Sequence, residues 1–305
     1  MPLDESQHLQ LQDFFNQSDF TNSGGVITDL DGTAIHEFQG RYSIPDTVEL
    51  GLKKIYDLGR PVVLNTLRFP LSVMRTFGKD WYRISNNPIP TVLMNGSQLG
   101  FIVENKEELI YEEIAAFPLQ HTEIEQVVLK VKQLLEEGIQ DLLVFFYPRK
   151  WQEGEIIWTP IKEKIPFVQK KYQSAASVIT GEIGLLEELL KSQDICMIFL
   201  LIDIPEDKLM AYQHTKKNNF FNTQGVDKLS GAISISGHLN FDMAHSVGAG
   251  DSEMDSFLSG VGLAVHVGNP YLSFKGVLPP LKLKGSSELG ELLFELANMQ
   301  RTVIK

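Results

Sequence analysis

Apolar runs and amphipathic stretches alternate along the first hundred residues of the chain. The runs at 26–27, 61–65 and 91–94 are short and do not alternate with polar residues, as is typical of parallel strands covered on both faces. Between them, apolar residues recur at helical spacing over 45–59 and 71–77. The order strand, helix, strand, helix, strand predicts an α/β fold with a Rossmann-like, doubly wound parallel sheet as its core.

The regular alternation stops near residue 97 and returns after residue 225. Strands and helices still follow one another between these points, but in a mixed order that is typical of an α+β unit. We expect the following elements there: a hairpin over 99–113, helices over 122–137, 185–191 and 205–216, and strands over 142–146, 156–159 and 195–203.

This change of pattern divides the chain into a core and an insert. We expect residues 1–96 and 223–305 to form the core with its parallel sheet, and residues 97–222 to form an inserted α+β cap domain. Residues 1–23 precede the first strand as an N-terminal extension, in which scattered apolar residues predict a short helix. The opening pattern returns in strands at 245–249 and 261–265 and in a helix at 286–299.

Composition places the chain among ordinary globular proteins and disfavours some partners. Of its 305 residues, 43% are hydrophobic and 22% are charged. The formal net charge of -12 disfavours nucleic acid, although one local cation would still allow a small anionic substrate. The one cysteine, Cys196, excludes an internal disulfide, and no stretch is apolar enough for a signal peptide or a transmembrane span. These features predict a cytoplasmic protein without a membrane partner.

Two carboxylates follow the first apolar run. Asp29 and Asp31 are two residues apart, so on an extended segment their side chains point the same way and converge on one small volume. Gly32 then lets the backbone turn sharply. Neighbouring carboxylates repel and raise each other's pKa unless a cation lies between them. The pattern fits a metal-assisted nucleophile with an acid/base beside it, although a strand that ends in an Asp-Gly turn has the same sequence.

Further polar residues stand at or near the ends of the other predicted core strands. Each has an ordinary interpretation taken alone: Thr66 as a helix N-cap, Lys228 as a surface lysine. Their joint appearance beside core strands favours one site instead. The residues concerned are Thr66, Arg68, Asn95, Lys228, Asp251 and Asp255. Four carboxylates in one crevice need neutralisation, and hard oxygen ligands in this number suit Mg²⁺.

These segments resemble those of the haloacid dehalogenase (HAD) superfamily of phosphatases. The resemblance rests on Asp29-Leu30-Asp31-Gly32-Thr33, Thr66, Lys228, and Gly250-Asp251 with Asp255, and it covers about residues 25–297. The large insertion resembles the cap of the Cof-like subgroup, which includes sugar-phosphate phosphatases. Asn95-Gly96 and Gly268-Asn269 also match patterns of that subgroup. It departs from them at Leu67, Met254 and Leu229, where the subgroup commonly has Gly, Asn and Gly.

The chemistry of these residues and the resemblance assign the same roles. Asp29 would be the nucleophile that forms an aspartyl-phosphate, and Asp31 the general acid and base. Thr66 and Lys228 would bind the phosphate group. Arg68 would either reach the substrate or pair with a nearby acid, and Asn95 is a candidate for substrate contact.

The same resemblance implies a Mg²⁺ cofactor. The carboxylate of Asp29, the backbone carbonyl of Asp31 and the carboxylate of Asp251 would hold the ion, with waters completing its octahedron. Asp255 would either join the metal shell or orient Lys228. The set of expected metal residues is therefore Asp29, Asp31, Asp251 and Asp255.

The expected function is Mg²⁺-dependent hydrolysis of a small phosphorylated metabolite, most simply a sugar phosphate. Two other functions use the same residues. One is phosphoryl transfer between substrates, as in phosphomutases of this fold. The other is a non-catalytic phospho-ligand sensor or effector, which the presence of both Asp29 and Asp31 disfavours.

Overall fold

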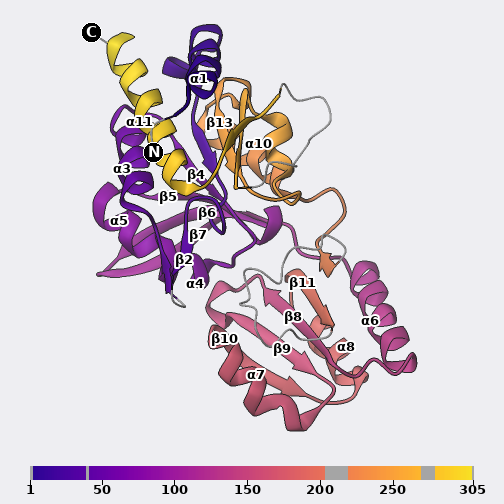
Figure 1. The fold of residues 1–305 in the computed structure, drawn as a ribbon. Helices are drawn as coiled ribbons and strands as arrows, with labels where there is room; N and C mark the ends of the chain where they lie inside the picture. The colour runs from indigo at the N-terminus through magenta and orange to yellow at the C-terminus, as the bar shows by residue number, and fades with distance from the viewer. Residues whose placement is uncertain (1–2, 39–40, 203–218, 269–278, 304–305) are drawn as a thin grey trace.

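The computed structural model describes residues 3–38, 41–202, 219–268 and 279–303, and these form two units, each built on its own β-sheet (Figure 1). The larger unit contains an eight-stranded sheet in the order β15-β14-β13-β1-β4-β5-β6-β7. Six of its strands run parallel: β1 (Val26–Thr28), β4 (Val62–Asn65), β5 (Ile89–Leu93), β13 (Val247–Gly250), β14 (Leu263–Val267) and β15 (Leu281–Leu283). The predicted α/β core with a parallel sheet is confirmed.

Helices cover both faces of this sheet, which explains why its strands are apolar throughout. On one face lie α3 (Asp46–Asp57), α5 (Lys79–Ser85) and α11 (Ser286–Val303), and on the other lies α10 (Lys228–Leu239). Val26 packs into the first of these layers, whereas the next residue, Ile27, packs into the second. The expected helix over 71–77 is present as α4 (Pro70–Val73), a π-helical turn (Met74–Gly78) and then α5.

The smaller unit is built on a five-stranded sheet in the order β10-β9-β8-β11-β12. Its strands are β8 (Leu142–Pro148), β9 (Glu155–Thr159), β10 (Ala175–Thr180), β11 (Ile195–Ile202) and β12 (Phe220–Phe221). Helices α6 (His121–Glu136) and α8 (Ile183–Lys191) pack on one face, while α7 (Ile165–Lys171) packs beside β10. The strand β10 and the helix α7 are absent from the sequence prediction.

The hairpin expected over 99–113 belongs to the larger sheet, not to the insert. It is formed by β6 (Gln98–Asn105) and β7 (Glu108–Ala116), and β6 pairs antiparallel with β5. A strand that follows β5 after a short turn pairs with it directly, which extends the core sheet. We therefore propose that the cap domain spans 117–222 rather than 97–222. The expected helix over 205–216 and Asn269 lie outside the described residues.

The N-terminal extension is part of the core. Helix α1 (Glu5–Gln17) forms where a short helix is predicted and buries Leu11 completely. The Gln7 amide donates to the carbonyl of Lys282 on β15 at 2.7 Å, and His8 Nδ1 lies 2.6 Å from Glu295 Oε2 on α11. A short helix α2 (Phe20–Ser23) precedes β1, and β2 (His36–Phe38) and β3 (Arg41–Ser43) form a small hairpin after it.

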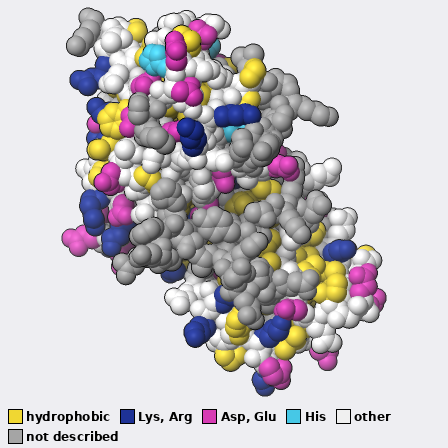
Figure 2. Space-filling model, viewed as in Figure 1, with side chains coloured by type: hydrophobic (Ala, Val, Ile, Leu, Met, Phe, Trp, Pro, Cys, Tyr) yellow, Lys and Arg dark blue, Asp and Glu magenta, His cyan; other side chains and the backbone are white. Residues whose placement is uncertain are grey.

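Two surface properties bear on possible partners. Figure 2 shows acidic and basic side chains interspersed over the visible face of both units, rather than one continuous basic patch among the coloured residues. Among the described helices, none is both long enough and apolar enough to cross a membrane.

Candidate active site

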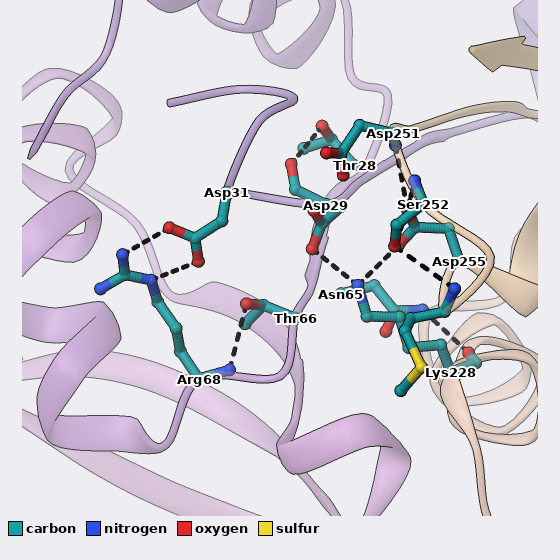
Figure 3. A network of polar contacts seen from close by, with 11 residues as sticks. Thr28, Asp29, Asp31, Asn65, Thr66, Arg68, Lys228, Asp251, Ser252 and Asp255 are labelled. Atoms are coloured by element: carbon teal, nitrogen blue, oxygen red, sulfur yellow. Dashed lines mark hydrogen bonds and ion pairs between the residues drawn. The ribbon is translucent and has the colours of Figure 1, made fainter. Parts of the chain in front are cut away.

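The predicted polar residues come together at the carboxyl ends of three neighbouring strands (Figure 3). Asp29 follows β1, Thr66 follows β4, and Asp251 follows β13. Lys228 is the first residue of α10, which packs across β4 and β5. The backbone N–H of Asp29 donates to the carbonyl of Ala249 at 2.9 Å, which fixes the end of β1 against β13. The site therefore lies where ligands of open α/β sheets bind.

Lys228 lies between two carboxylates, and its side chain is only 2% exposed. Its Nζ is 2.6 Å from Asp29 Oδ1 and 2.6 Å from Asp255 Oδ1. Burial alone would lower the pKa of Lys228, but Asp255 and Asp29 raise it by more, so the net shift is upward. The lysine is thus a buried ammonium within the site, and the surface-lysine interpretation is wrong.

Asp255 uses its second carboxylate oxygen to shape the loop after β13. Its Oδ2 accepts from the backbone N–H groups of Asp251 at 3.0 Å and Ser252 at 2.9 Å. The Ser252 hydroxyl lies 3.3 Å from the same oxygen. Because its Oδ1 accepts from Lys228, Asp255 holds both the lysine and the loop that carries Asp251.

An acidic cluster forms the centre of the site. Carboxylate oxygens of Asp29, Asp251 and Asp255 lie within 4.8 Å of one another. Burial raises the pKa of Asp29 well above its ordinary value despite the nearby Lys228, and burial with repulsion from Asp255 raises that of Asp251 to about 7. When all three carboxylates are ionised, Lys228 neutralises only one of their charges, and a bound cation would neutralise the excess that raises these pKa values. Hard, buried oxygen donors with this excess fit a divalent ion such as Mg²⁺.

Gly32 permits this close arrangement. Its φ of +78° lies in the left-handed region, and a Cβ added there would lie 2.3 Å from Asp251 Oδ2. The turn that the sequence predicts at this glycine is thus present, and it also leaves space for the carboxylate of Asp251.

Asp31 turns away from the acidic cluster and pairs with Arg68 (Figure 3). Arg68 Nε donates to Asp31 Oδ2 at 2.6 Å, and its Nη2 donates to Asp31 Oδ1 at 2.5 Å, which makes a bidentate pair. Asp29 and Asp31 do not share one direction because the strand ends before Asp29 and the chain turns at Leu30, whose carbonyl accepts from Thr33. Of the two roles considered for Arg68, the structure shows the pairing with an acid.

Thr66 and Asn65 lie at the end of β4. The Thr66 side chain is buried, and its Oγ1 accepts from the backbone N–H of Arg68 at 3.2 Å. The Asn65 amide donates to the backbone carbonyl of Lys228 at 2.8 Å. Sequence reasoning did not select Asn65 or Ser252. The signal for Asn65 was a polar residue at the last position of a buried apolar strand.

The remaining candidate, Asn95, lies beside the site in a turn after β5. Its amide donates to Asn222 Oδ1 at 2.9 Å, at the point where the chain returns from the smaller unit to the larger one. Of the three departures from the family pattern, Met254 is buried in the loop before Asp255, and Leu67 is partly buried between Thr66 and Arg68. The third, Leu229, is partly buried at the second position of α10.

Solved structures with this fold cover nearly the whole chain. A HAD-superfamily phosphatase from Bacteroides thetaiotaomicron shares 15% identity, with a TM-score of 0.62 over 92% of this chain and 96% of that chain. A HAD subclass IIB sugar phosphatase shares 14% identity, with a TM-score of 0.60 over 91% and 99%. A putative HAD/COF-like hydrolase from Plasmodium vivax shares 18% identity, with a TM-score of 0.66 over 97% and 100%. At these identities the comparison establishes the shared fold.

Sequence comparison gives the family. No curated protein matches the chain. The model of the haloacid dehalogenase-like hydrolases matches residues 26–275, which contain Asp29, Thr66, Lys228 and Asp251. This match spans more than half of the sequence, and the fold agrees with it. The chain belongs to the haloacid dehalogenase-like hydrolase family.

Proposed function

We propose that this protein is a Mg²⁺-dependent phosphatase that hydrolyses a small phosphorylated metabolite, a sugar phosphate in the simplest case. The observation that carries the proposal is the buried contact of Lys228 with Asp29 and Asp255 beside Asp251, at the carboxyl ends of the core strands. One structural neighbour is described as a sugar phosphatase of the same superfamily, which supports this substrate class.

In the proposed first step, a carboxylate oxygen of Asp29 attacks phosphorus in line with the leaving group. The Asp29 O–P bond forms as the P–O bond to the leaving alkoxide breaks, and Asp31 gives that alkoxide a proton. In the second step, Asp31 takes a proton from water as the water attacks the aspartyl-phosphate. Inorganic phosphate leaves and the Asp29 carboxylate is restored.

Asp31 needs a change of partner for this role. Both of its oxygens accept from Arg68 in the structure, so one of these hydrogen bonds is released, and the freed oxygen takes up a proton from solvent, before Asp31 reaches the leaving group. Arg68 also donates to Ser72 Oγ at 2.9 Å, which keeps the guanidinium in place during that movement. In our proposal Arg68 therefore holds Asp31, the general acid and base, beside the site until the substrate binds.

The phosphate group would lie against Thr66 and Lys228. The Thr66 hydroxyl has a proton to donate to a phosphate oxygen, and Lys228 offsets the charge of Asp29 as the anionic substrate approaches. The carboxylates of Asp29 and Asp251 and the backbone carbonyl of Asp31 would hold Mg²⁺. Bound there, the ion reduces the repulsion between the nucleophile and the phosphate.

The insert would cover the site and select the leaving group. Phe69, next to Arg68, packs against Tyr147 of β8, with the ring centroids 5.5 Å apart. The insert thus contacts the same loop that carries Thr66. In our proposal, closure of the insert over this loop excludes bulk water from the substrate.

The test is phosphate release from a panel of phosphorylated metabolites, with and without Mg²⁺. We expect release that depends on Mg²⁺, and an Asp29→Asn variant that folds normally but is slower by at least about a thousandfold. Product analysis separates free phosphate from phosphate transferred to a second substrate. Near-normal release by Asp29→Asn, or transfer without free phosphate, would contradict the proposal.

A further inference from the structure

A strained turn follows β5 next to the proposed phosphate site. Three successive residues have positive φ: Met94 at 50°, Asn95 at 58° and Gly96 at +97°. Residues other than glycine rarely adopt this conformation, so contacts with the surroundings must hold Met94 and Asn95 in it.

The turn contacts both segments that carry the proposed phosphate ligands. The backbone N–H of Met94 donates to the carbonyl of Arg68 at 3.2 Å, and that of Asn95 donates to the carbonyl of Thr66 at 3.3 Å. A Cβ at Gly96 would lie 2.1 Å from the carbonyl oxygen of Asp227, the residue before Lys228. The position of this turn therefore sets the positions of the Thr66 loop and of the start of α10.

Asn222 connects the turn to the insert. It directly follows β12, which pairs with β11, so it is the residue at which the chain leaves the insert's sheet. Its Oδ1 accepts from Asn95 Nδ2 at 2.9 Å. Its Nδ2 lies 2.7 Å from Ser97 Oγ and 3.1 Å from the carbonyl of Met94.

The next residues bind to the insert itself. The Thr223 hydroxyl donates to Glu123 Oε2 at 2.8 Å, and the Gln224 N–H donates to Glu123 Oε1 at 2.7 Å. Glu123 lies in the first turn of α6. Residues 222–226 thus form a linker between β12 and the start of α10. The linker is attached to α6 of the insert through Thr223 and Gln224 and to the strained turn through Asn222.

We propose that Asn222 and Asn95 are positioning residues that couple the placement of the insert to the Thr66 loop and to Lys228. Movement of the linker pulls on the turn through the Asn95–Asn222 pair, and the turn transmits the shift to both segments. The catalytic meaning of this coupling rests on the proposed phosphatase function. The coupling itself is a mechanical property that is measured without substrate.

The first test is amide hydrogen exchange of the full-length chain carrying Asn222→Ala. We expect exchange at least about fivefold faster than in the unmodified protein, both in the linker and in residues 66–70 and 227–232. Asn105→Ala, at the exposed end of β6, is the matched control and leaves these segments unchanged. Faster exchange confined to residues 219–226 would overturn the coupling, because a purely local role predicts that result.

A second variant breaks the same pair from the core side. Asn95→Gly removes the amide but keeps a residue that tolerates positive φ, so it tests the pair if Asn222→Ala fails to fold. We expect it to speed exchange in the same segments, and the double variant to add little further. Fully additive effects would show that the two amides act independently and would contradict the proposal.

Turnover of acetyl phosphate gives the catalytic readout. This small substrate has little leaving group for the insert to hold, so a variant that only loosens the insert leaves its kcat unchanged. Coupling to Thr66 and Lys228 predicts a kcat about tenfold lower for Asn222→Ala and for Asn95→Gly. If the unmodified protein released no phosphate from any substrate, the proposed function would fail, and the exchange measurements would still decide the coupling.

Discussion

At the scale of single residues, Lys228 should contribute strongly to stability, because its buried ammonium contacts two carboxylates. Lys228→Met leaves the buried carboxylates of Asp29 and Asp255 without their ammonium partner. Removing one member of a buried ion pair costs about 3–5 kcal/mol, so we expect a lower unfolding midpoint in metal-free buffer. Because Mg²⁺ supplies positive charge to the same cluster, we expect it to raise the midpoint of the variant more than that of the unmodified protein.

Thermal unfolding with and without Mg²⁺ measures this difference. Lys150→Met is the matched control because the Lys150 side chain is 82% exposed, and its loss should change the midpoint very little. Equal shifts by Mg²⁺ in Lys228→Met and in the unmodified protein would show that the ion does not bind beside Lys228.

The residues that could be predicted share a local signal. Asp29, Thr66 and Asp251 each follow a short apolar run, and strand ends of a parallel sheet meet at one edge. The roles of Asn65 and Asn222 depend instead on partners more than 100 positions away, at separations of 163 and 127 residues. No local pattern encodes such a partner. For Arg68 the sequence leaves two roles open, and the acid with which it pairs, Asp31, lies 37 positions away.

At the scale of elements, spacing predicted most helices and strands of the core, but not which strands pair. The helical period of α3 and the apolar run of β4 are properties of their own residues. The sequence predicts the hairpin of β6 and β7 but places it in the insert, whereas β6 pairs with β5 of the larger sheet, because strand pairing depends on the topology of the neighbouring chain. Strand β10 was missed because most of its side chains are only partly buried, which weakens the apolar signal.

Strand β9 carries a buried acid that should make stability depend on pH. Glu155 accepts from the Tyr147 hydroxyl at 2.6 Å, and burial raises its pKa from 4.5 to about 7 despite this hydrogen bond. Between these pH values the unfolded chain releases the proton while the folded chain keeps it, so stability falls as pH rises. A pKa shift of this size lowers the free energy of unfolding by about 3 kcal/mol between pH 4.5 and 7. Above pH 7 the Glu155 contribution no longer changes with pH.

Urea denaturation at several pH values tests this contribution by difference. Other buried acids also titrate in this range, so we compare the unmodified protein with Glu155→Gln, which removes only the Glu155 contribution. We expect the variant to lose less stability between pH 5 and 7. Glu153→Gln, in the adjacent turn and exposed, is the control. Parallel pH curves for the unmodified protein and Glu155→Gln would show that Glu155 ionises as readily in the folded state as in the unfolded one.

At the scale of the whole molecule, the contact between Phe69 and Tyr147 should hold the insert against the core. Phe69 belongs to the core yet packs in the apolar cluster of the insert's sheet, and only 5% of its surface is exposed. Truncating a buried phenylalanine removes about 3–5 kcal/mol of packing, and here that loss falls on the contact between the two units. Phe69→Ala should therefore shift the molecule toward separated units.

Small-angle X-ray scattering measures this shift as a larger radius of gyration, and limited proteolysis should detect faster cleavage between the units. Phe167→Ala is the matched control, because Phe167 is 43% exposed on α7 within the insert and its loss leaves the contact intact. If the units hold together mainly through Arg149, whose Nη2 lies 2.7 Å from Glu113 Oε1 on β7, Phe69→Ala will scatter like the unmodified protein. In that case high salt, which screens this exposed ion pair, will increase the radius of gyration instead. The two results assign the contact to apolar packing or to the ion pair.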